Sequence, residues 1–489
     1  MKLSQLFGPY RTARRVGEDV AVTGIQTDSR LVRPGDLFVC IPGFRTDGHQ
    51  FAREAVAKGA VALVVEREVP VEVPKVFVRD ARRALAFAAD RFYGHPTREL
   101  KLIGVTGTNG KTTTTHLLTR ILEEAGHTPG LIGTMAIRYA GREEPAVNTT
   151  PDALVLQRTF RAMVDAGVDY AVMEVSSHAL ALGRVRGCRF RTAVFTNLTQ
   201  DHLDFHQTME AYKQAKGLLF AQLAGDYRDG RETFAVLNAD DPVAEEYAAL
   251  TAAQVLTYGM GEGCDVRARD VQVTPAGVSF RLESFAGAAD VELPLVGHFN
   301  VYNALAAVTA ALAEGIPLET AVRALADVTV RGRFEKVDEG QPFTVIVDYA
   351  HTPDGLANVL KAARALTSGR VIVVVGCGGD RDRTKRPVMA RIAVAYADLA
   401  VFTSDNPRSE DPERILDEME AGVPDDARTR TVRLTDRRAA IRYAIDAAKP
   451  GDLVLIAGKG HETYQIIGDR VLPFDDVQEA REALRGRGW

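Results

Sequence analysis

A glycine-rich turn between an apolar strand and a helix is the feature that most constrains this chain. Residues 105–113 read Val-Thr-Gly-Thr-Asn-Gly-Lys-Thr-Thr and follow the apolar segment 102–105. Apolar residues after the turn are spaced along one face of a helix, which Gly126 is placed to end. Backbone N–H groups and the positive end of a helix dipole bind anions at such a turn. The pattern therefore predicts a phosphate-binding loop between a buried strand and a helix.

The side chains of this loop indicate a nucleoside triphosphate with its metal ion. Lys111 is placed to reach the terminal phosphates, and the Thr112 hydroxyl is placed to bind Mg²⁺. Val105 stands where the longer form of the motif has glycine, so this is a shorter form, and the alternative is a chance glycine turn before a helix. The loop residues that we expect to bind the nucleotide are Gly107, Thr108, Asn109, Gly110, Lys111, Thr112 and Thr113.

Composition bounds the rest of the interpretation. A chain of 489 residues is too long for one core and predicts two to four domains. The net charge of −5 argues against a nucleic-acid partner bound by bulk electrostatics. The four cysteines form no CxxC pair, and the chain shows neither a signal peptide nor an apolar run long enough for a membrane span. We therefore expect a cytoplasmic protein without a membrane partner.

Alternating strand and helix patterns predict an α/β protein with three domains. The first block, 1–97, is a smaller α/β domain, and the second, 98–330, contains the phosphate-binding loop and a parallel sheet. In the third block, 331–489, four apolar segments read as buried parallel strands of a Rossmann-like domain. Expected helices include 81–92 and 303–314.

Polar motifs stand directly after the four predicted strands of the third block. They occupy residues 349–353, 376–381, 405–408 and 458–462. Because ligands bind at the carboxyl ends of strands in open α/β sheets, we expect the four motifs to form one site. The motif at 376–381 fails the dinucleotide fingerprint, since Arg381 stands where the third glycine belongs. Asp405-Asn406-Pro407-Arg408 is either a proline turn or a turn whose arginine binds a carboxylate with two hydrogen bonds.

Three further residues have both a chemical and a structural interpretation. Glu174 ends an apolar strand, where it either holds Mg²⁺ or caps a turn. His202 is a plausible second metal ligand, although a histidine in such a place is more often a satisfied polar residue. Lys216 lies in a helical segment that is apolar on one side, and spacing alone favours a lysine whose ammonium reaches solvent.

Taken together, these motifs resemble the Mur ligase family, the ATP-dependent amino-acid ligases of bacterial cell-wall synthesis, along nearly the whole chain. The segments that carry the resemblance are 106–114, 174–178, 197–204, 238–241, 297–304, 332–333 and 348–351. Within the family, the first block is similar to that of the MurE type, which adds the third residue of the peptide stem. The rival interpretations are folylpolyglutamate synthase, a related ligase with a similar loop, and a non-catalytic nucleotide-binding regulator on the same scaffold.

The resemblance implies binding residues for a UDP-linked substrate in the first two blocks. By similarity, the residues at the UDP-muramoyl dipeptide are Thr27, Ser29, Phe44, Arg45, Thr46, Asn148, Thr149, Thr150, Ser176 and Arg184. The sequence departs from some relatives at Leu182, where they have glutamine, so that contact is not carried over. Asn303 and Arg333 join the ATP-binding residues by the same similarity.

The resemblance also implies a metal site and an amine site. Lys216 falls on the family's carbamylated lysine, so the implied Mg²⁺ ligands are Thr112, Glu174, His202 and the carbamate of Lys216. The implied catalytic residues are Lys111, Glu174, His202 and Lys216. The residues implied at diaminopimelate are Arg386, Asp405, Asn406, Pro407, Arg408, Gly458 and Glu462.

The implied activity is an ATP-dependent amide-bond ligase of peptidoglycan precursor synthesis that acts as a monomer. It adds meso-diaminopimelate to UDP-N-acetylmuramoyl-L-alanyl-D-glutamate through an acyl phosphate, and ADP and phosphate are released. Lysine-adding relatives differ from this chain at residues 405–408. The chemistry of the residues agrees, since Arg408 suits the distal carboxylate of diaminopimelate and Glu462 its ammonium.

Overall fold

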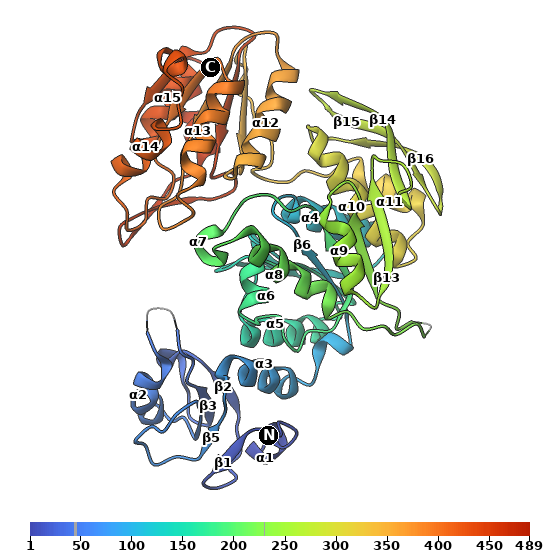
Figure 1. The fold of residues 1–489 in the computed structure, drawn as a ribbon, viewed down its shortest axis with the longest axis vertical. Helices are drawn as coiled ribbons and strands as arrows, with labels where there is room; N and C mark the ends of the chain where they lie inside the picture. Colours follow the sequence, from blue (N-terminus) through green and yellow to red (C-terminus); the bar gives the residue numbers. More distant parts are fainter. Residues whose placement is uncertain (44–45, 229) are drawn as a thin grey trace. The chain divides into compact units, whose positions relative to one another are not determined.

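The computed structural model describes residues 1–43, 46–228 and 230–489, which form two compact units (Figure 1). The first unit contains residues 1–104, 127–193 and 222–233, and the second contains 105–126, 194–221 and 234–489. Strands β6 (Lys101–Thr106) and β11 (Phe190–Phe195) each begin in the first unit and end in the second.

The N-terminal part of the first unit is a five-stranded sheet with the order β1-β5-β4-β3-β2. Its strands are β1 (Arg14–Val16), β2 (Gly24–Gln26), β3 (Asp36–Val39), β4 (Ala62–Val65) and β5 (Lys75–Phe77), of which only β1 runs antiparallel to its neighbour. Its helices are α1 (Leu3–Phe7), α2 (Ala52–Ala57) and α3 (Ala81–Phe92). Successive β3 residues alternate between two apolar clusters, Leu37 in one and Phe38 in the other. A strand buried on both faces reads as continuously apolar, which is why the sequence predicted it.

An eleven-stranded sheet has the order β16-β15-β14-β13-β12-β11-β6-β10-β7-β8-β9. Its other strands are β7 (Pro129–Ile132), β8 (Ala136–Tyr139), β9 (Arg142–Pro145), β10 (Tyr170–Glu174), β12 (Phe234–Asn238), β13 (Gln254–Gly259), β14 (Val266–Thr274), β15 (Gly277–Ser284) and β16 (Gly287–Leu293). Its helices are α4 (Lys111–Glu124), α5 (Ala153–Asp165), α6 (Ser177–Ala181), α7 (Leu203–His206), α8 (Met209–Ala221), α9 (Val243–Leu250), α10 (His298–Ala313) and α11 (Leu318–Leu325).

The third block is a six-stranded sheet with the order β17-β18-β22-β19-β20-β21. Its strands are β17 (Glu335–Val337), β18 (Thr344–Asp348), β19 (Val371–Val375), β20 (Leu399–Phe402), β21 (Thr431–Arg433) and β22 (Leu453–Ala457), and a separate hairpin joins β23 (Tyr464–Ile467) to β24 (Arg470–Pro473). Its helices are α12 (Pro353–Leu366), α13 (Lys385–Tyr396), α14 (Pro412–Glu420), α15 (Arg437–Ala447) and α16 (Asp476–Gly486). The pairs β18–β22, β22–β19 and β19–β20 are parallel, as expected.

Side chains along β19 point alternately to the two faces of the sheet, and helices cover both faces, so this block has a helix–sheet–helix arrangement. Val371, Val373 and Val375 pack in a cluster with residues of α12, α13 and α14. Ile372 and Val374 pack on the other face with residues of α15 and α16. Burying both faces of the strand removes its apolar side chains from water, at about 25 cal/mol per Å². The four strands that the sequence predicted here are therefore the inner strands of the sheet.

The α/β fold class is confirmed, and two features of the second block differ from expectation. Helix α10 begins at His298, five residues before the predicted start, because the signal used was the apolar run from Asn303 onward. The antiparallel strands β14, β15 and β16 were not predicted. Many of their exposed residues are charged, and tight turns at Gly277 and Gly287 connect the strands. The available signal was therefore the alternation of apolar and polar residues.

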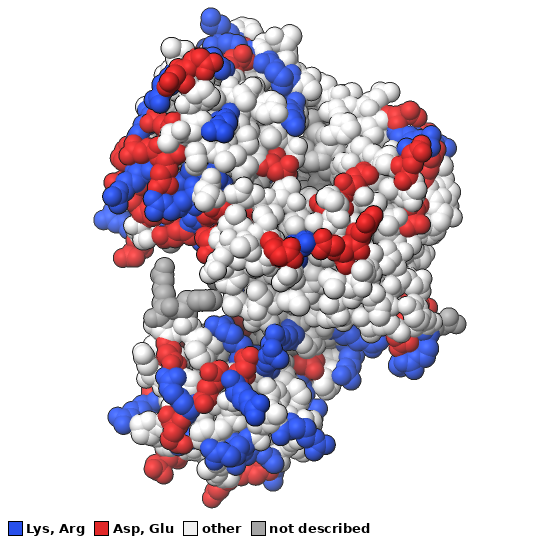
Figure 2. Space-filling model, in the orientation of Figure 1, with Lys and Arg blue, Asp and Glu red and all other residues white. Residues whose placement is uncertain are grey.

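Surface charge is mixed on the face of the molecule shown in Figure 2. Basic and acidic side chains alternate over the part of the surface that belongs to the third block. Exposed ion pairs of the third block include Lys336–Asp338 and Arg364–Asp398. Within the described ranges, no helix has both the length and the apolar character that a bilayer crossing requires.

Candidate active site

The phosphate loop, residues 107–113, has the backbone geometry of an anion cradle. Gly107 and Gly110 have positive φ angles of 149° and 86°, and α4 begins directly after Gly110. A Cβ at Gly107 would lie 1.8 Å from Thr196 Oγ1, and one at Gly110 would lie 2.3 Å from Asn303 Oδ1. Glycine is thus required at both positions for conformational and steric reasons. The N–H groups of the first turn of α4 lie at the positive end of this 14-residue helix.

The loop is fixed to the end of β11 by hydrogen bonds within the second unit. Thr196 Oγ1 donates to the carbonyl of Asn109 at 2.6 Å, and the Asn109 N–H donates to Asn197 Oδ1 at 2.9 Å. Lys111 folds over the loop, and its Nζ donates to the carbonyl oxygens of Gly107 and Thr108 at 2.8 and 2.9 Å. A phosphate oxygen can replace these neutral acceptors with a charge-assisted bond.

Lys216 contacts the same loop from α8. Its Nζ donates to the Gly107 carbonyl at 2.8 Å and lies 4.5 Å from the centroid of the Tyr212 ring. The side chain is buried, so the expectation from spacing alone that its ammonium reaches solvent is wrong. Burial, reinforced by the charge of Lys111, lowers the pKa of Lys216 well below the ordinary lysine value. A neutral, nucleophilic amine is the form that these surroundings favour.

The predicted metal ligands are divided between the units. Thr112, His202 and Lys216 belong to the second unit, whereas Glu174 belongs to the first. Glu174 is buried and accepts hydrogen bonds from the N–H and the hydroxyl of Thr134 at 2.9 and 3.0 Å, as a carboxylate that caps a turn does. In the described part of the chain, no group of three or more His, Cys, Asp or Glu side chains is arranged to hold a metal ion. Unmodified lysine cannot bind Mg²⁺, so this donor set fits the ion only if Lys216 carries an oxygen ligand.

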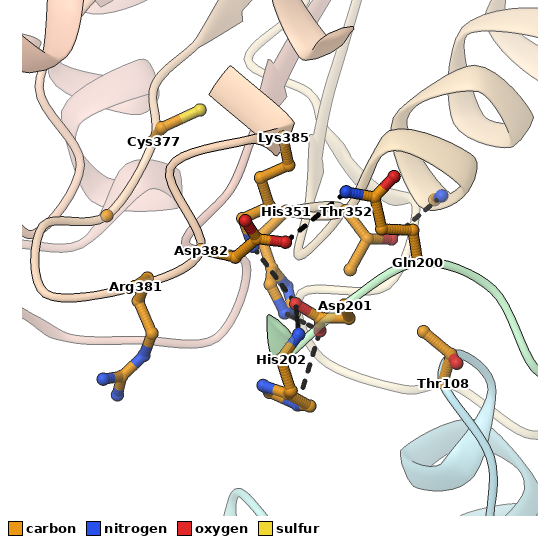
Figure 3. A network of polar contacts seen from close by, with 12 residues as sticks. Thr108, Gln200, Asp201, His202, His351, Thr352, Cys377, Arg381, Asp382 and Lys385 are labelled. Carbon is orange, nitrogen blue, oxygen red and sulfur yellow. Dashed lines mark hydrogen bonds and ion pairs between the residues drawn. The ribbon is translucent and has the colours of Figure 1, made fainter. Parts of the chain in front are cut away.

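His202 lies in a charged network that sequence reasoning missed (Figure 3). The carboxylate of Asp201, which is 4% exposed, lies 3.4 Å from His202 Nε2, 3.4 Å from Lys385 Nζ and 3.9 Å from His351 Nε2. Burial alone would raise the pKa of Asp201, but the charges of Lys385, His202 and His351 hold it well below the usual range. Gln200 donates to Thr384 Oγ1 at 3.0 Å beside this network.

The network joins the loop after β11 to the start of α13 in the third block. Asp201 and His202 are adjacent in sequence, but His351 and Lys385 come from two other segments. The available signal was Asp201, directly before His202. A metal-bound histidine usually donates its second ring N–H to a carboxylate or a carbonyl, so a nearby acidic residue could have been predicted as its partner.

A cavity of about 300 Å³ lies beside the phosphate loop within the second unit. Its walls come from the loop, from α10 and from residues 348–359. Polar groups that line it include Asn109, Asn238, Tyr302, Asn303 and Arg333. Its size and mixed lining suit a small organic ligand such as a nucleoside. The structure therefore brings Asn303 and Arg333 to the loop, and Arg333 Nη2 donates to Thr112 Oγ1 at 3.0 Å.

The residues predicted at the UDP-linked substrate all belong to the first unit. Thr150 Oγ1 donates to the Glu174 carbonyl at 2.8 Å and accepts from the Ser176 N–H at 3.0 Å, while Arg184 Nη1 donates to the Thr150 carbonyl at 2.9 Å. Thr149 lies 3.0 Å from Thr134, hydroxyl to hydroxyl. The structure thus groups Thr149, Thr150, Ser176 and Arg184 around the end of β10.

The remaining predicted residues of that set lie elsewhere in the first unit. Ser29 is buried in a short 3₁₀ helix, Thr27 is partly buried, and Asn148 and Thr46 are exposed. Phe44 and Arg45 lie outside the described residues. The structure therefore leaves their part in substrate binding as a prediction.

Asp405, Asn406, Arg408, Gly458 and Glu462, which are predicted at the amine, follow strand ends of the third block, and we call this group the amine pocket. Asn406 Nδ2 donates to Glu462 Oε2 at 2.9 Å, and a Cβ on Gly458 would lie 2.9 Å from Asp405 Oδ2. Arg408 has a positive φ of 53°, and its Nη1 donates to the Gly379 carbonyl at 2.8 Å. A non-glycine residue held in this region is uncommon, and such strain clusters at functional sites.

Hydrogen bonds to the β23–β24 hairpin fix the unusual backbone of Arg408. Its N–H donates to the Ile466 carbonyl at 3.1 Å, and its carbonyl accepts from the Gly468 N–H at 2.7 Å. Arg386, also predicted at the amine, is buried and forms ion pairs at 2.8 Å with both Glu410 and Glu418. The structure thus places Glu462 against Asn406, two residues before Arg408, and places the Arg386 guanidinium in an ion cluster with Glu410 and Glu418.

Lys459 is a further charged residue that sequence reasoning missed. It stands inside the strand-end motif 458–462 and is 0% exposed. Its glycine neighbours, Gly458 and Gly460, both have positive φ angles, which hold the side chain inward. The flanking glycines were the signal that could have singled out this lysine.

Fold and site together define a nucleotide-binding α/β protein of the phosphate-loop class. Three family models match it: "Mur ligase family, catalytic domain" at residues 21–93, "Mur ligase middle domain" at 105–311, and "Mur ligase, glutamate ligase domain" at 332–460. The chain belongs to the Mur ligase family.

Individual relatives agree with this assignment. The chain is 59% identical over 473 residues to the UDP-N-acetylmuramoyl-L-alanyl-D-glutamate–2,6-diaminopimelate ligase of Geobacillus kaustophilus, which covers 96% of both chains. It is 55% identical over 471 residues to the ligase of that name from Bacillus cereus, covering 96% of this chain and 95% of the relative. A solved structure of a ligase with that name has a TM-score of 0.68 at 34% identity and covers 100% of this chain and 99% of its own.

Proposed function

We propose that this protein is an ATP-dependent ligase that joins meso-diaminopimelate to UDP-N-acetylmuramoyl-L-alanyl-D-glutamate in peptidoglycan precursor synthesis. The observation that carries the proposal is the 59% identity, over 96% of both chains, to a ligase whose name states these substrates. The phosphate loop and the amine pocket, with opposite charges on Arg408 and Glu462, support it chemically. The proposed domains are 1–97 for the UDP-linked substrate, 98–330 for ATP and 331–489 for the amino acid, in a monomer.

The proposed reaction has two steps. First, a γ-carboxylate oxygen of the D-glutamate attacks the γ-phosphorus of ATP, ADP leaves, and an acyl phosphate forms. The amine of diaminopimelate then attacks the acyl carbon, loses its proton, and phosphate leaves from the tetrahedral intermediate. Lys111 and Arg333 neutralise charge on the phosphoryl group during transfer, and this preorganised electrostatic stabilisation is a large part of such catalysis. Holding three substrates together supplies much of the remainder.

Mg²⁺ fits the proposed donor set when Lys216 carries a carbamate. The Lys216 nitrogen attacks CO₂, a C–N bond forms and a proton leaves, so a neutral amine becomes an anionic oxygen ligand. The lowered pKa of Lys216 favours this step, because only the deprotonated amine is nucleophilic. Thr112, Glu174, His202 and the carbamate would hold the ion, which supplies Lewis-acid stabilisation of the phosphates when bound.

The experiment that tests the function is an assay of phosphate release with the purified protein. ATP, the UDP-dipeptide and meso-diaminopimelate are supplied together and then omitted one at a time. Release that depends on all three, with a product whose mass equals the dipeptide plus diaminopimelate minus water, supports the proposal. ATP hydrolysis that does not respond to the amine would contradict it.

A further inference from the structure

Lys459 contacts the side chains of three residues that we assign to the amine pocket. Its Nζ donates to Glu462 Oε2 at 2.9 Å and to Asn406 Oδ1 at 3.1 Å, and it lies 3.6 Å from Asp405 Oδ1. The side chain is 0% exposed, so its charge is neutralised by these neighbours and not by water. Two of the three N–H donors of the ammonium are therefore used within the pocket, and Asp405 adds an ion pair.

Asn406 completes the arrangement. Its Oδ1 accepts from Lys459 and its Nδ2 donates to Glu462, so one amide fixes the lysine and the glutamate at the same time. Oδ1 also accepts from the N–H of Ile466 at 2.9 Å, which ties the group to the β23–β24 hairpin. Lys459, Asn406 and Glu462 are thus linked to one another by hydrogen bonds within the chain itself.

The charges that face the pocket balance one another. Asp405 and Glu462 are its two carboxylates, and Lys459 and Arg408 are its two cations. The neighbouring cations have their own partners: Arg437 forms a buried pair with Asp476 at 2.6 Å, and Arg386 pairs with Glu410 and Glu418. These four side chains together therefore have no net formal charge. A ligand end that also has no net charge, with one ammonium and one carboxylate, matches this balance.

Without Lys459, the same pocket would present two carboxylates against one cation. Opposite charges in a partly buried site interact strongly because the local dielectric is low. Such a pocket favours an end with an ammonium alone, which is the end that lysine has. Lys459 therefore disfavours lysine by occupying the carboxylates that would otherwise bind its ammonium, and this is specificity by rejection of the wrong ligand.

We infer that Lys459 is a specificity-determining residue, which keeps the pocket neutral and so directs it to a zwitterionic diamino dicarboxylic acid over a diamino monocarboxylic one. This inference rests on the proposed function. It assigns Lys459 to positioning, because the lysine acts through Glu462 and Asp405 and is not required to touch the substrate.

The test compares kcat/KM for meso-diaminopimelate and for L-lysine in the wild type, Lys459→Met and Lys459→Gln. We expect the preference for diaminopimelate to fall at least about tenfold in both variants, with activity toward lysine unchanged or increased. Lys459→Gln keeps a hydrogen-bond donor, so it covers the case in which the methionine variant does not fold. Lys336→Met is the matched control: this exposed lysine also pairs with a carboxylate, Asp338, and its loss should leave the ratio unchanged.

A double variant separates charge balance from a merely structural role. Lys459→Met combined with Asp405→Asn removes one positive and one negative charge, so the pocket returns to neutrality. Charge balance predicts that the double variant recovers part of the lost preference relative to Lys459→Met. A structural role predicts that it is worse than either single variant. An unchanged ratio in Lys459→Met and Lys459→Gln, or a double variant without recovery, would overturn the inference.

The proposed function and this inference fail in different ways. If the wild type does not turn over diaminopimelate, the proposed function is wrong. If the wild type does so and the Lys459 variants keep its preference, only the inference is wrong. Binding of ATP, measured by calorimetry on each variant, reports whether the phosphate loop is intact and whether a lost activity reflects misfolding.

Discussion

The phosphate loop and the amine pocket belong to the same unit and hold their lysines in contrasting surroundings. Lys111 donates to the neutral carbonyl oxygens of Gly107 and Thr108, whereas Lys459 donates to a carboxylate and an amide. A phosphate offers Lys111 stronger acceptors than it has, so the loop gains energy from any suitable anion. In the amine pocket, an arriving charge competes with pairs that already exist. The loop therefore contributes to nucleotide binding and to the rate of catalysis, whereas the pocket determines which amine is used.

The largest effect that this comparison predicts is at Lys111. Lys111→Ala removes the cation nearest the transferring phosphoryl group, and we expect kcat/KM to fall at least about a thousandfold, or ~4 kcal/mol. The ratio of activities toward diaminopimelate and lysine should stay the same, because the amine pocket is untouched. Steady-state kinetics with both amines measures this, and thermal unfolding checks the fold. Activity within about tenfold of wild type would contradict the assignment of the loop.

Lys216 should have the next largest effect, again on rate. If its carbamate holds Mg²⁺, Lys216→Ala removes an oxygen ligand, and we expect activity to fall by at least about two orders of magnitude, or ~2.7 kcal/mol. Short carboxylates added to the buffer should restore part of it by taking the vacated space beside Tyr212. Kinetics over a range of Mg²⁺ and formate concentrations tests this. A fully active Lys216→Ala protein would show that no such ligand exists.

The two regions also differ in how much of them could be predicted from sequence. The phosphate loop is one contiguous segment whose glycines and lysine have fixed spacing, so its strand, turn and helix followed from local rules. The amine pocket combines strand ends that are 50 residues apart, and the motifs at 405–408 and 458–462 were found only because each follows an apolar strand. That Lys459 pairs with Asn406 and Glu462 depends on side-chain packing between the two segments, which periodicity does not encode.

The same limit applies to Lys216 and to the network around Asp201. Spacing alone assigned Lys216 to solvent, since a helix with one apolar side gives no indication of a loop that packs over its polar side. Asp201, His351 and Lys385 come from three segments, and only the folded chain brings them together. In physical terms, elements and strand ends follow from local patterns, whereas buried ion pairs require the tertiary contacts.

Arg408 is expected to have a smaller effect on rate and a larger one on selectivity. The wild type should prefer meso-diaminopimelate to L-lysine at least about a hundredfold in kcat/KM, or ~2.7 kcal/mol, since lysine leaves the guanidinium without a carboxylate. Arg408→Ala should reduce this preference by losing activity toward diaminopimelate. Activity toward lysine should stay the same or rise slightly, because the carboxylates of Asp405 and Glu462 then face one cation, Lys459. Comparable rates with both amines in the wild type would show that the pocket does not discriminate.

The smallest effect on rate is expected at the buried pair formed by Asp201 and Lys385, which connects the loop after β11 to the third block. Both side chains are buried, at 4% and 5% exposure, and Lys385 directly precedes Arg386 on α13. Removing one partner leaves the other charge buried without its pair, so Asp201→Asn and Lys385→Met should each lower the melting temperature and reduce kcat about tenfold, or ~1.4 kcal/mol. The double variant should lose less stability and activity than the two single variants combined, with a coupling energy of about 0.5–3 kcal/mol.

Additive effects would mean that the pair does not connect the loop after β11 to the third block. A change in the ratio of diaminopimelate to lysine activity would instead show that this pair also affects the amine pocket. Catalytic rate and amine selectivity would then not be controlled by separate regions of the molecule.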